Sequence, residues 1–160
     1  MKNFITKIEV KWAIIFTALA LVWMLIEKMA GWHEPPGIEN HATYTNIFSV
    51  IAIAVYVFAL RDVKQNRFDG NMNWKQGFLS GLAISVIIML LTPLSQLITH
   101  YVISPDYFQN AIDLGIAKGE DEAYVRGFFT LKNYMIISAV GAVIMGAITA
   151  AIVAIFVRSK

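Results

Sequence analysis

The chain has 160 residues, a formal net charge of +2, no cysteine and a hydrophobic content of 58%. This content exceeds the roughly 45–50% apolar residues of soluble domains, and a mean hydropathy of +0.60 agrees with it. The absence of cysteine excludes disulfide scaffolds, thiol redox relays, thiolate metal sites and cysteine nucleophiles. We therefore expect an integral membrane protein that forms a single domain over residues 1–160.

Four apolar stretches are long enough, or nearly so, to cross a bilayer as helices, since a hydrocarbon core of about 30 Å needs about 20 residues. They cover about residues 12–32, 43–60, 78–103 and 134–157. The first resembles the apolar region of a secretory signal, but the charged pair Glu27-Lys28 stands where a cleavage site needs small residues. We expect this span to be retained, and we predict an all-α bundle of four transmembrane helices.

Turn signals separate the predicted spans. Residues 35–37 (Pro-Pro-Gly) break the helix after the first span, and residues 61–76 form a basic loop after the second. Residues 104–106 (Ser-Pro-Asp) follow the third span and predict a helix start, with the serine as N-cap and the proline at the first helical position. A short amphipathic helix is predicted from there to residues 118–119 (Lys-Gly). A second helix is predicted from about Glu120, and it either ends before the fourth span or continues into it.

Basic residues are divided unequally between the two sides of the predicted bundle. Nine precede the first span, lie between the second and third, or follow the fourth: Lys2, Lys7, Lys11, Arg61, Lys64, Arg67, Lys75, Arg158 and Lys160. Four lie in the other two loops: Lys28, Lys118, Arg126 and Lys132. Short loops rich in lysine and arginine stay on the cytoplasmic side. The sequence therefore predicts that both termini face the cytoplasm and that the amphipathic helix lies on the outer surface.

Small residues recur every four positions in the third and fourth spans. The predicted packing residues are Gly77, Gly81 and Ser85 in the third span, and Ser138, Ala142, Gly146 and Ala150 in the fourth. Small side chains let helix backbones approach closely in lipid, where burial of apolar surface does not drive association. We expect the two faces to meet each other within the chain, with contacts to a second copy or to a membrane partner as the alternative.

Polar residues gather at the outer ends of the first three spans. The candidate polar site consists of Glu27, His41, Tyr44, Asn46, Gln96 and His100. In the third span, Gln96 and His100 share one helical face, and Pro93 beside them is expected to kink the helix. This zone predicts an outward-facing pocket for a proton, a metal ion or a small polar ligand. The alternative is that these groups only hydrogen-bond between helices or pair Glu27 with Lys28 or His41.

Sequence motifs argue against several chemistries. No HxxxH-like spacing occurs, so metal ligands would have to come from separate helices, and we predict neither a metal site nor a cofactor. No GxSxG element and no phosphate-binding loop is found, which disfavours an enzyme. The basic loop lacks interleaved aromatic residues, which disfavours a nucleic-acid partner. The expected partners are the lipid bilayer and either a membrane protein or a second copy of the chain.

Several stretches resemble a known bacterial membrane family, domain of unknown function 4199. They are KWAIIFTALALVWMLIEKMAGWH, HATYTNIFSV, WKQGFLSGLAISVI and TPLSQLITHYVISPDYFQNAI, together with the last span. The resemblance covers almost the whole chain and implies a four-span protein of the bacterial inner membrane with no established activity. It marks ten positions without assigning them roles: Glu27, His41, Tyr44, Asn46, Trp74, Gly77, Gly81, Pro93, Pro105 and Tyr107.

Two functions are compatible with these features, and the sequence favours the first. The first is an accessory or interaction subunit of a membrane complex, whose packing faces and outer helix contact a partner. The second is a small transporter or sensor that uses the outward polar site. Coupled transport usually places an ionisable residue near the bilayer midplane, and the second, third and fourth spans carry none at that depth. This counts against a transporter.

Overall fold

The computed structural model describes residues 4–159, and within this range it is helical without any strand. Lys2 and Lys160, which contribute to the charge argument, lie outside the described residues. Four segments are long and apolar enough to cross a membrane: Lys7–Met29, Gly37–Arg67, Trp74–Ile103 and Leu131–Val157. The predicted all-α architecture with four transmembrane segments is confirmed.

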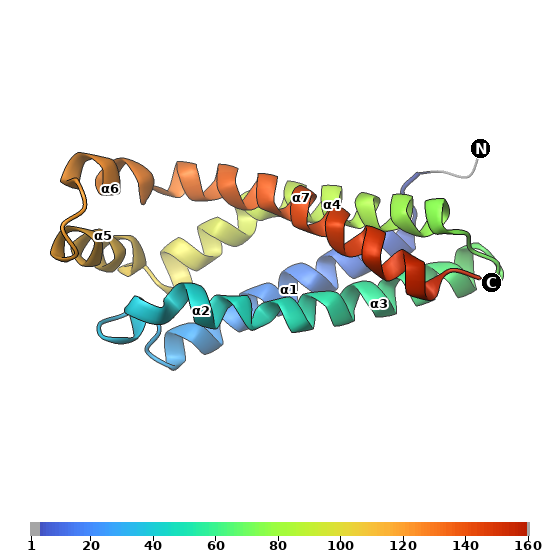
Figure 1. Cartoon of the computed structure of the whole chain (residues 1–160), viewed down its shortest axis with the longest axis horizontal. Helices are drawn as coiled ribbons and strands as arrows, with labels where there is room; N and C mark the ends of the chain where they lie inside the picture. Colours follow the sequence, from blue (N-terminus) through green and yellow to red (C-terminus); the bar gives the residue numbers. More distant parts are fainter. Residues whose placement is uncertain (1–3, 160) are drawn as a thin grey trace.

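The helices follow one another with short connections. Their bounds are α1 Lys7–Met29, η1 Gly37–Asn40, α2 His41–Asn46, α3 Phe48–Arg67, α4 Trp74–Ile98, the π-helical turn η2 Thr99–Ile103, α5 Tyr107–Ala117, α6 Glu122–Phe128 and α7 Leu131–Val157. The long helices lie side by side along the long axis of the molecule (Figure 1). The start of α1 and the end of α7 share one end, which we call the terminal end, while α2, α5 and α6 form the opposite or far end (Figure 1). Which end faces the cytoplasm stays a prediction.

The second membrane segment is longer than its apolar run. The sequence predicted a loop from residue 61, but α3 continues to Arg67 and ends before Asp69 and Gly70, which have positive φ angles of 50° and 81°. Hydropathy indicates which part of a helix can lie in lipid, whereas a turn residue marks where the helix ends. The last turns of α3 are therefore a polar extension of the span.

The connection between α4 and α7 also differs in detail from the prediction. The amphipathic helix α5 begins at Tyr107, and Ser104 does not cap it, because the buried Ser104 hydroxyl has no hydrogen-bond partner among the described residues. The Ser104 amide closes the π-helical turn on the Thr99 carbonyl at 2.8 Å. The second helix, α6, ends at Phe128. A new helix, α7, begins after Thr130, whose side chain accepts a hydrogen bond from the Asn133 amide. A capping hydroxyl thus separates the two helices.

Helices α4 and α7 pack closely through their small residues. A Cβ atom on Gly77 would lie 3.1 Å from Cβ of Ala154, and one on Gly81 would overlap Cβ of Ala150. Gly146 faces Ser85 and lies against the Tyr56 hydroxyl, which is hydrogen-bonded to Ser85 at 2.8 Å. The predicted small-residue positions of the two spans therefore face each other within one chain. Ala142 packs at the edge of the same core, and Ser138 is hydrogen-bonded to Gln96.

The outer faces of the long helices are apolar and exposed. Ile14, Val50, Leu90 and Ile144 are 55%, 69%, 67% and 54% exposed, one from each membrane segment. Such faces suit lipid, in which apolar side chains need no protein cover. The long apolar helices therefore indicate contact with a bilayer.

A buried ion pair lies at the terminal end. Glu9 is fully buried, accepts the Thr6 amide at 2.9 Å, and forms an ion pair with Arg67 across the α1–α3 interface. Arg67 also donates to the Ser80 hydroxyl at 3.3 Å. The fold uses Glu9 to join α1 to α3 and, through Arg67, to α4.

Candidate polar site at the far end

The carboxylate of Glu27 is the centre of the polar site. Glu27 lies in the last turn of α1 and is fully buried. Its Oε1 accepts hydrogen bonds from Trp23 Nε1 at 2.6 Å and from Thr45 Oγ1 at 2.9 Å. Its Oε2 lies 3.2 Å from Nε2 of His33 and 3.2 Å from Nε2 of His41. Four side chains thus surround one buried carboxylate, which compensates for its removal from water.

The turn after α1 brings His33 back to this carboxylate. Gly31 has a φ of 76°, which reverses the chain, and the Trp32 amide then bonds to the Glu27 carbonyl at 3.0 Å. His33 is only 2% exposed, and its carbonyl accepts a hydrogen bond from Asn110 of α5 at 3.0 Å. Within residues 4–159, its second ring nitrogen, Nδ1, is buried without a hydrogen-bond partner.

His41 connects the carboxylate to two tyrosines. It is the first residue of α2, and its Nδ1 lies 3.2 Å from the Tyr107 hydroxyl, which lies 3.3 Å from the Tyr134 hydroxyl. Burial raises the pKa of Tyr107, so its phenol stays protonated at neutral pH. Aromatic packing fixes the arrangement, since the Tyr107 ring lies 5.2 Å and 5.0 Å from the rings of His33 and His41.

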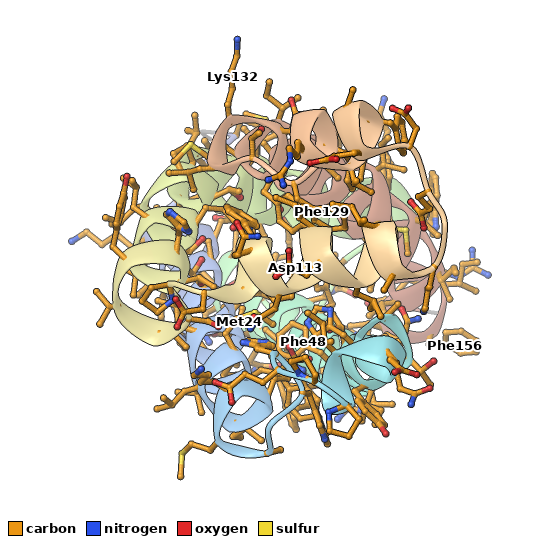
Figure 2. All side chains as sticks on the ribbon, turned by 90° about the vertical axis from the view of Figure 1, so that its left-hand side faces the viewer. Met24, Phe48, Asp113, Phe129, Lys132 and Phe156 are labelled. Carbon is orange, nitrogen blue, oxygen red and sulfur yellow. The ribbon has the colours of Figure 1, made fainter. Side chains whose placement is uncertain are left out.

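A cavity of about 270 Å³ adjoins this cluster. Its lining comes from all four membrane segments, from the loop after α1 and from α5: Met24, His33, His41, Thr45, Gln96, Thr99, His100, Ser104, Tyr107, Phe108, Tyr134 and Ser138. Seen from the far end, α5 crosses the middle of the molecule between α1 and α2 on one side and α6 and α7 on the other (Figure 2). Helix α5 thus covers the end of the bundle in which the cavity lies.

Helix α4 supplies the opposite wall. Helix α4 contains Pro93, and its far-end part diverges from α7 (Figure 1). Gln96 bridges the two helices by donating to the Ser138 hydroxyl at 2.9 Å. His100 stacks on Phe108 of α5 with ring centroids 4.9 Å apart. Gln96 and His100 thus each contact a neighbouring helix and also line the cavity.

The six predicted site residues fall into three groups. Glu27 and His41 are in direct contact, and Gln96 and His100 line the cavity together with His41. The ring of Tyr44 stacks on that of Trp32 with centroids 4.3 Å apart, and Tyr44 does not line the cavity. Asn46 lines a neighbouring groove of about 540 Å³ between α2 and α5. Three of the six thus line one cavity, and Glu27 adjoins it through His41.

Sequence reasoning missed several members of the site. Trp23 precedes Glu27 by four residues and hence shares its helical face, and this spacing is the signal that could have identified it. His33 and Thr45 are polar residues of the same zone but are not among the six candidates. Tyr107 is one of the ten positions that the family resemblance marks without a role, and Tyr134 begins the predicted fourth span. No local signal identifies these tyrosines, because their contacts depend on how α5 folds back over the bundle.

The arrangement offers two kinds of chemistry. The imidazole, hydroxyl and amide groups can hydrogen-bond a small polar ligand. Glu27, His33 and His41 can also each offer one ligand atom to a metal ion, because these atoms all lie within 4.8 Å of one another. They come from the end of α1, the following loop and the start of α2, which a search for a short metal motif would not detect.

Comparison with known proteins adds a family but no activity. Residues 11–159 match the family described as "Protein of unknown function (DUF4199)". No curated protein and no solved structure matches the chain. The match covers nearly the whole chain, including every residue of the polar site.

Proposed function

We propose, from the premise that the chain belongs to the DUF4199 family of unknown function, that it is a membrane receptor or sensor for a small polar ligand. The observation that carries this proposal is the far-end cavity of about 270 Å³, whose polar lining comes from all four membrane segments. Drug-sized ligands occupy pockets of roughly 300–1,000 Å³. The expected ligand is therefore of the size of a small metabolite.

The lining also restricts the charge of the ligand. Among the described residues that line the cavity, none is Lys, Arg, Asp or Glu, and the polar groups are hydroxyls, imidazoles and one amide. A strongly charged ligand would have no opposite charge to compensate for its desolvation. An uncharged ligand with several hydrogen-bonding groups fits this lining best.

The charge distribution supports an outward-facing site in the bacterial inner membrane. Among residues 4–159, the terminal end carries seven of the eleven lysines and arginines, and the far end carries four. By the positive-inside rule the terminal end faces the cytoplasm, so the cavity would take its ligand from the outer side.

The core of the bundle favours a receptor over a transporter. Tyr56, Leu60 and Ile84 are 3%, 0% and 0% exposed and belong to one apolar cluster between the cavity and the terminal end. A transporter needs a polar route or a hinged site near the midplane. Among the described residues, this region offers packed apolar side chains instead.

The alternative role as an accessory subunit of a membrane complex has less support. The small-residue faces that were candidates for binding a partner are occupied, because Gly81 and Gly146 contact Ala150 and Ser85 of the same chain. The exposed apolar side chains need no cover beyond lipid. If a membrane partner exists, its role would be to respond when the cavity binds its ligand.

The test is native mass spectrometry of the protein extracted gently from its own membrane, with identification of small molecules that it retains. We expect a stoichiometric small-molecule adduct on the wild type that is lost in Gln96→Leu, because this change removes an amide from the cavity. The control is Gln109→Leu, on the exposed side of α5 at the same end, which should retain the adduct. A wild type that carries only lipid, or an adduct unchanged in Gln96→Leu, would contradict the proposal.

A further inference from the structure

Glu27, His33 and His41 form a compact set of ligand atoms beside the cavity. Their ligand atoms lie within 4.8 Å of one another, and Oε2 of Glu27 lies 3.2 Å from Nε2 of each histidine. We propose that these three side chains bind one divalent transition-metal ion of the zinc class. This inference goes beyond the cavity ligand and does not depend on it.

The distances suit a tetrahedral ion. Zinc binds imidazole nitrogen at about 2.0–2.1 Å and carboxylate oxygen at about 2.0–2.2 Å, which places neighbouring ligand atoms of a tetrahedron about 3.3 Å apart. The two oxygen–nitrogen separations of 3.2 Å match this value. The separation between the two nitrogens is at most 4.8 Å, and the half-buried ring of His41 can move to shorten it.

The types of ligand atom restrict the choice of ion. Two imidazoles and one carboxylate suit zinc and its transition-metal neighbours, whereas calcium and magnesium prefer oxygen ligands throughout. The charge also fits, because Glu27 is fully buried and a divalent cation would neutralise its carboxylate directly. Without cysteine in the chain, a thiolate site that would compete for the ion is absent.

Neighbouring groups hold the ligands in position. Trp23 and Thr45 both bond to Oε1 of Glu27, which leaves Oε2 directed at the two histidines. The Tyr107 hydroxyl lies 3.2 Å from Nδ1 of His41. Nδ1 can therefore carry the proton while Nε2 serves as the metal ligand. Such outer contacts fix the tautomer and orientation of a metal-binding histidine.

Hydrogen bonding alone leaves this cluster incomplete. His33 is 2% exposed, and its Nδ1 has no hydrogen-bond partner among the described residues. A buried ring nitrogen of this kind calls for a water molecule as its partner, because Nε2 of the same ring faces Glu27. His33 lines the cavity, so a water molecule there could reach its ring when Nε2 is bound to the metal.

Three protein ligands would leave a fourth position for an exchangeable group. In zinc sites with two histidines and one glutamate, this position holds water or a ligand. His33 and His41 both line the cavity, which gives the fourth position access to molecules that enter it. A water molecule from the cavity can fill this position, so the metal site is complete without the cavity ligand.

The experiment uses full-length protein purified in detergent with a tag that contains no histidine, freed of metal by a chelator. Titration with Zn²⁺ should show one ion bound per chain, and Co²⁺ should give the visible absorption of a tetrahedral site. We expect Glu27→Gln and His33→Gln each to weaken Zn²⁺ binding by more than about 100-fold, since loss of outer contacts alone costs roughly 10–100-fold.

His100→Gln is the matched control. His100 lines the same cavity and is also a histidine, but it does not belong to the cluster of three. It should bind Zn²⁺ as the wild type does, and Gln96→Leu should do so as well. If Gln96→Leu loses the cavity ligand but keeps Zn²⁺, the two sites are shown to be independent.

Two results would overturn the metal site. One is a wild type that takes up no stoichiometric Zn²⁺ and gives no tetrahedral Co²⁺ spectrum, a measurement that needs no variant. The other is Zn²⁺ binding that is unchanged in Glu27→Gln and His33→Gln while circular dichroism shows that both remain folded. Neither result would affect the cavity ligand, which is assayed separately by its retained mass.

Discussion

At the scale of single residues, the chain places two carboxylates where water does not reach them. Glu9 and Glu27 are both fully buried, one near each end of α1. Glu9 is compensated by a formal positive charge, that of Arg67. Glu27 is compensated by four neutral or titratable groups, namely one indole, one hydroxyl and two imidazoles. This difference makes Glu27 the residue that a bound cation would stabilise.

The hydrogen bonds of Glu27 predict a loss of stability in Glu27→Gln. The amide has one acceptor oxygen in place of two and carries no charge, so the charge-assisted hydrogen bonds around the carboxylate would be lost. Hydrogen bonds to charged groups contribute about 1.5–3 kcal/mol each. We expect a lower thermal unfolding midpoint in detergent, measured with a chelator present so that metal binding does not contribute.

The control for this change is Glu34→Gln in the neighbouring loop. Glu34 is exposed and forms an ion pair with Lys28, which lowers the pKa of its carboxyl. Exposed ion pairs contribute little to stability. If the unfolding midpoint fell equally in both variants, the buried hydrogen bonds of Glu27 would not be the cause of the lost stability.

At the scale of elements, the contact between α4 and α7 predicts opposite outcomes for two glycines of α7. A Cβ on Gly146 would overlap the Ser85 side chain and lie 2.6 Å from the Tyr56 hydroxyl. A Cβ on Gly141, in the same helix, would meet nothing within 4 Å. We expect Gly146→Ala to destabilise the bundle by about 1–3 kcal/mol through overpacking, and Gly141→Ala to be tolerated.

Unfolding by sodium dodecyl sulfate in mixed micelles, followed by circular dichroism, measures both variants. Both changes add one methyl group to the interior of the same helix, so their helix propensities cancel in the comparison. A Gly146→Ala variant as stable as Gly141→Ala would mean that α4 and α7 do not approach as closely as the structure shows.

At the scale of the whole molecule, the charge asymmetry predicts the orientation in the membrane. The chain lacks cysteine, so single cysteines can be introduced as reporters. Gln65 at the terminal end of α3 and Gln109 on α5 at the far end are both exposed and uncharged. Their replacement leaves the basic residues that set the topology unchanged.

We expect Gln109→Cys to react with a membrane-impermeant maleimide in intact bacterial cells, and Gln65→Cys to react only after lysis. The cysteine-free wild type is the blank, and denatured samples show that each cysteine can react. The reverse labelling pattern would place the cavity on the cytoplasmic side and would require a cytoplasmic ligand.

Composition and spacing along the chain were enough to predict the class of the molecule and the depth of its polar residues. Long apolar runs form helices in lipid, so the four spans followed from composition and the small-residue faces from spacing, whereas the family followed from a resemblance of whole stretches. The positions of Glu27, His41, Gln96 and His100 near one end followed from counting along those spans. These properties are local or periodic, and a sequence records them directly.

Only the tertiary structure decided which polar residues meet. His33 reaches Glu27 because the chain reverses at Gly31, and Tyr107 reaches His41 because α5 lies across the far end (Figure 2). Tyr44 lies at a similar depth but faces Trp32 instead. The depth of a residue in the membrane follows from its position along its own helix. Contact between two residues depends on how turns and short helices direct the chain in three dimensions. The sequence therefore predicted the zone, and the fold selected Glu27, His33 and His41 as its centre.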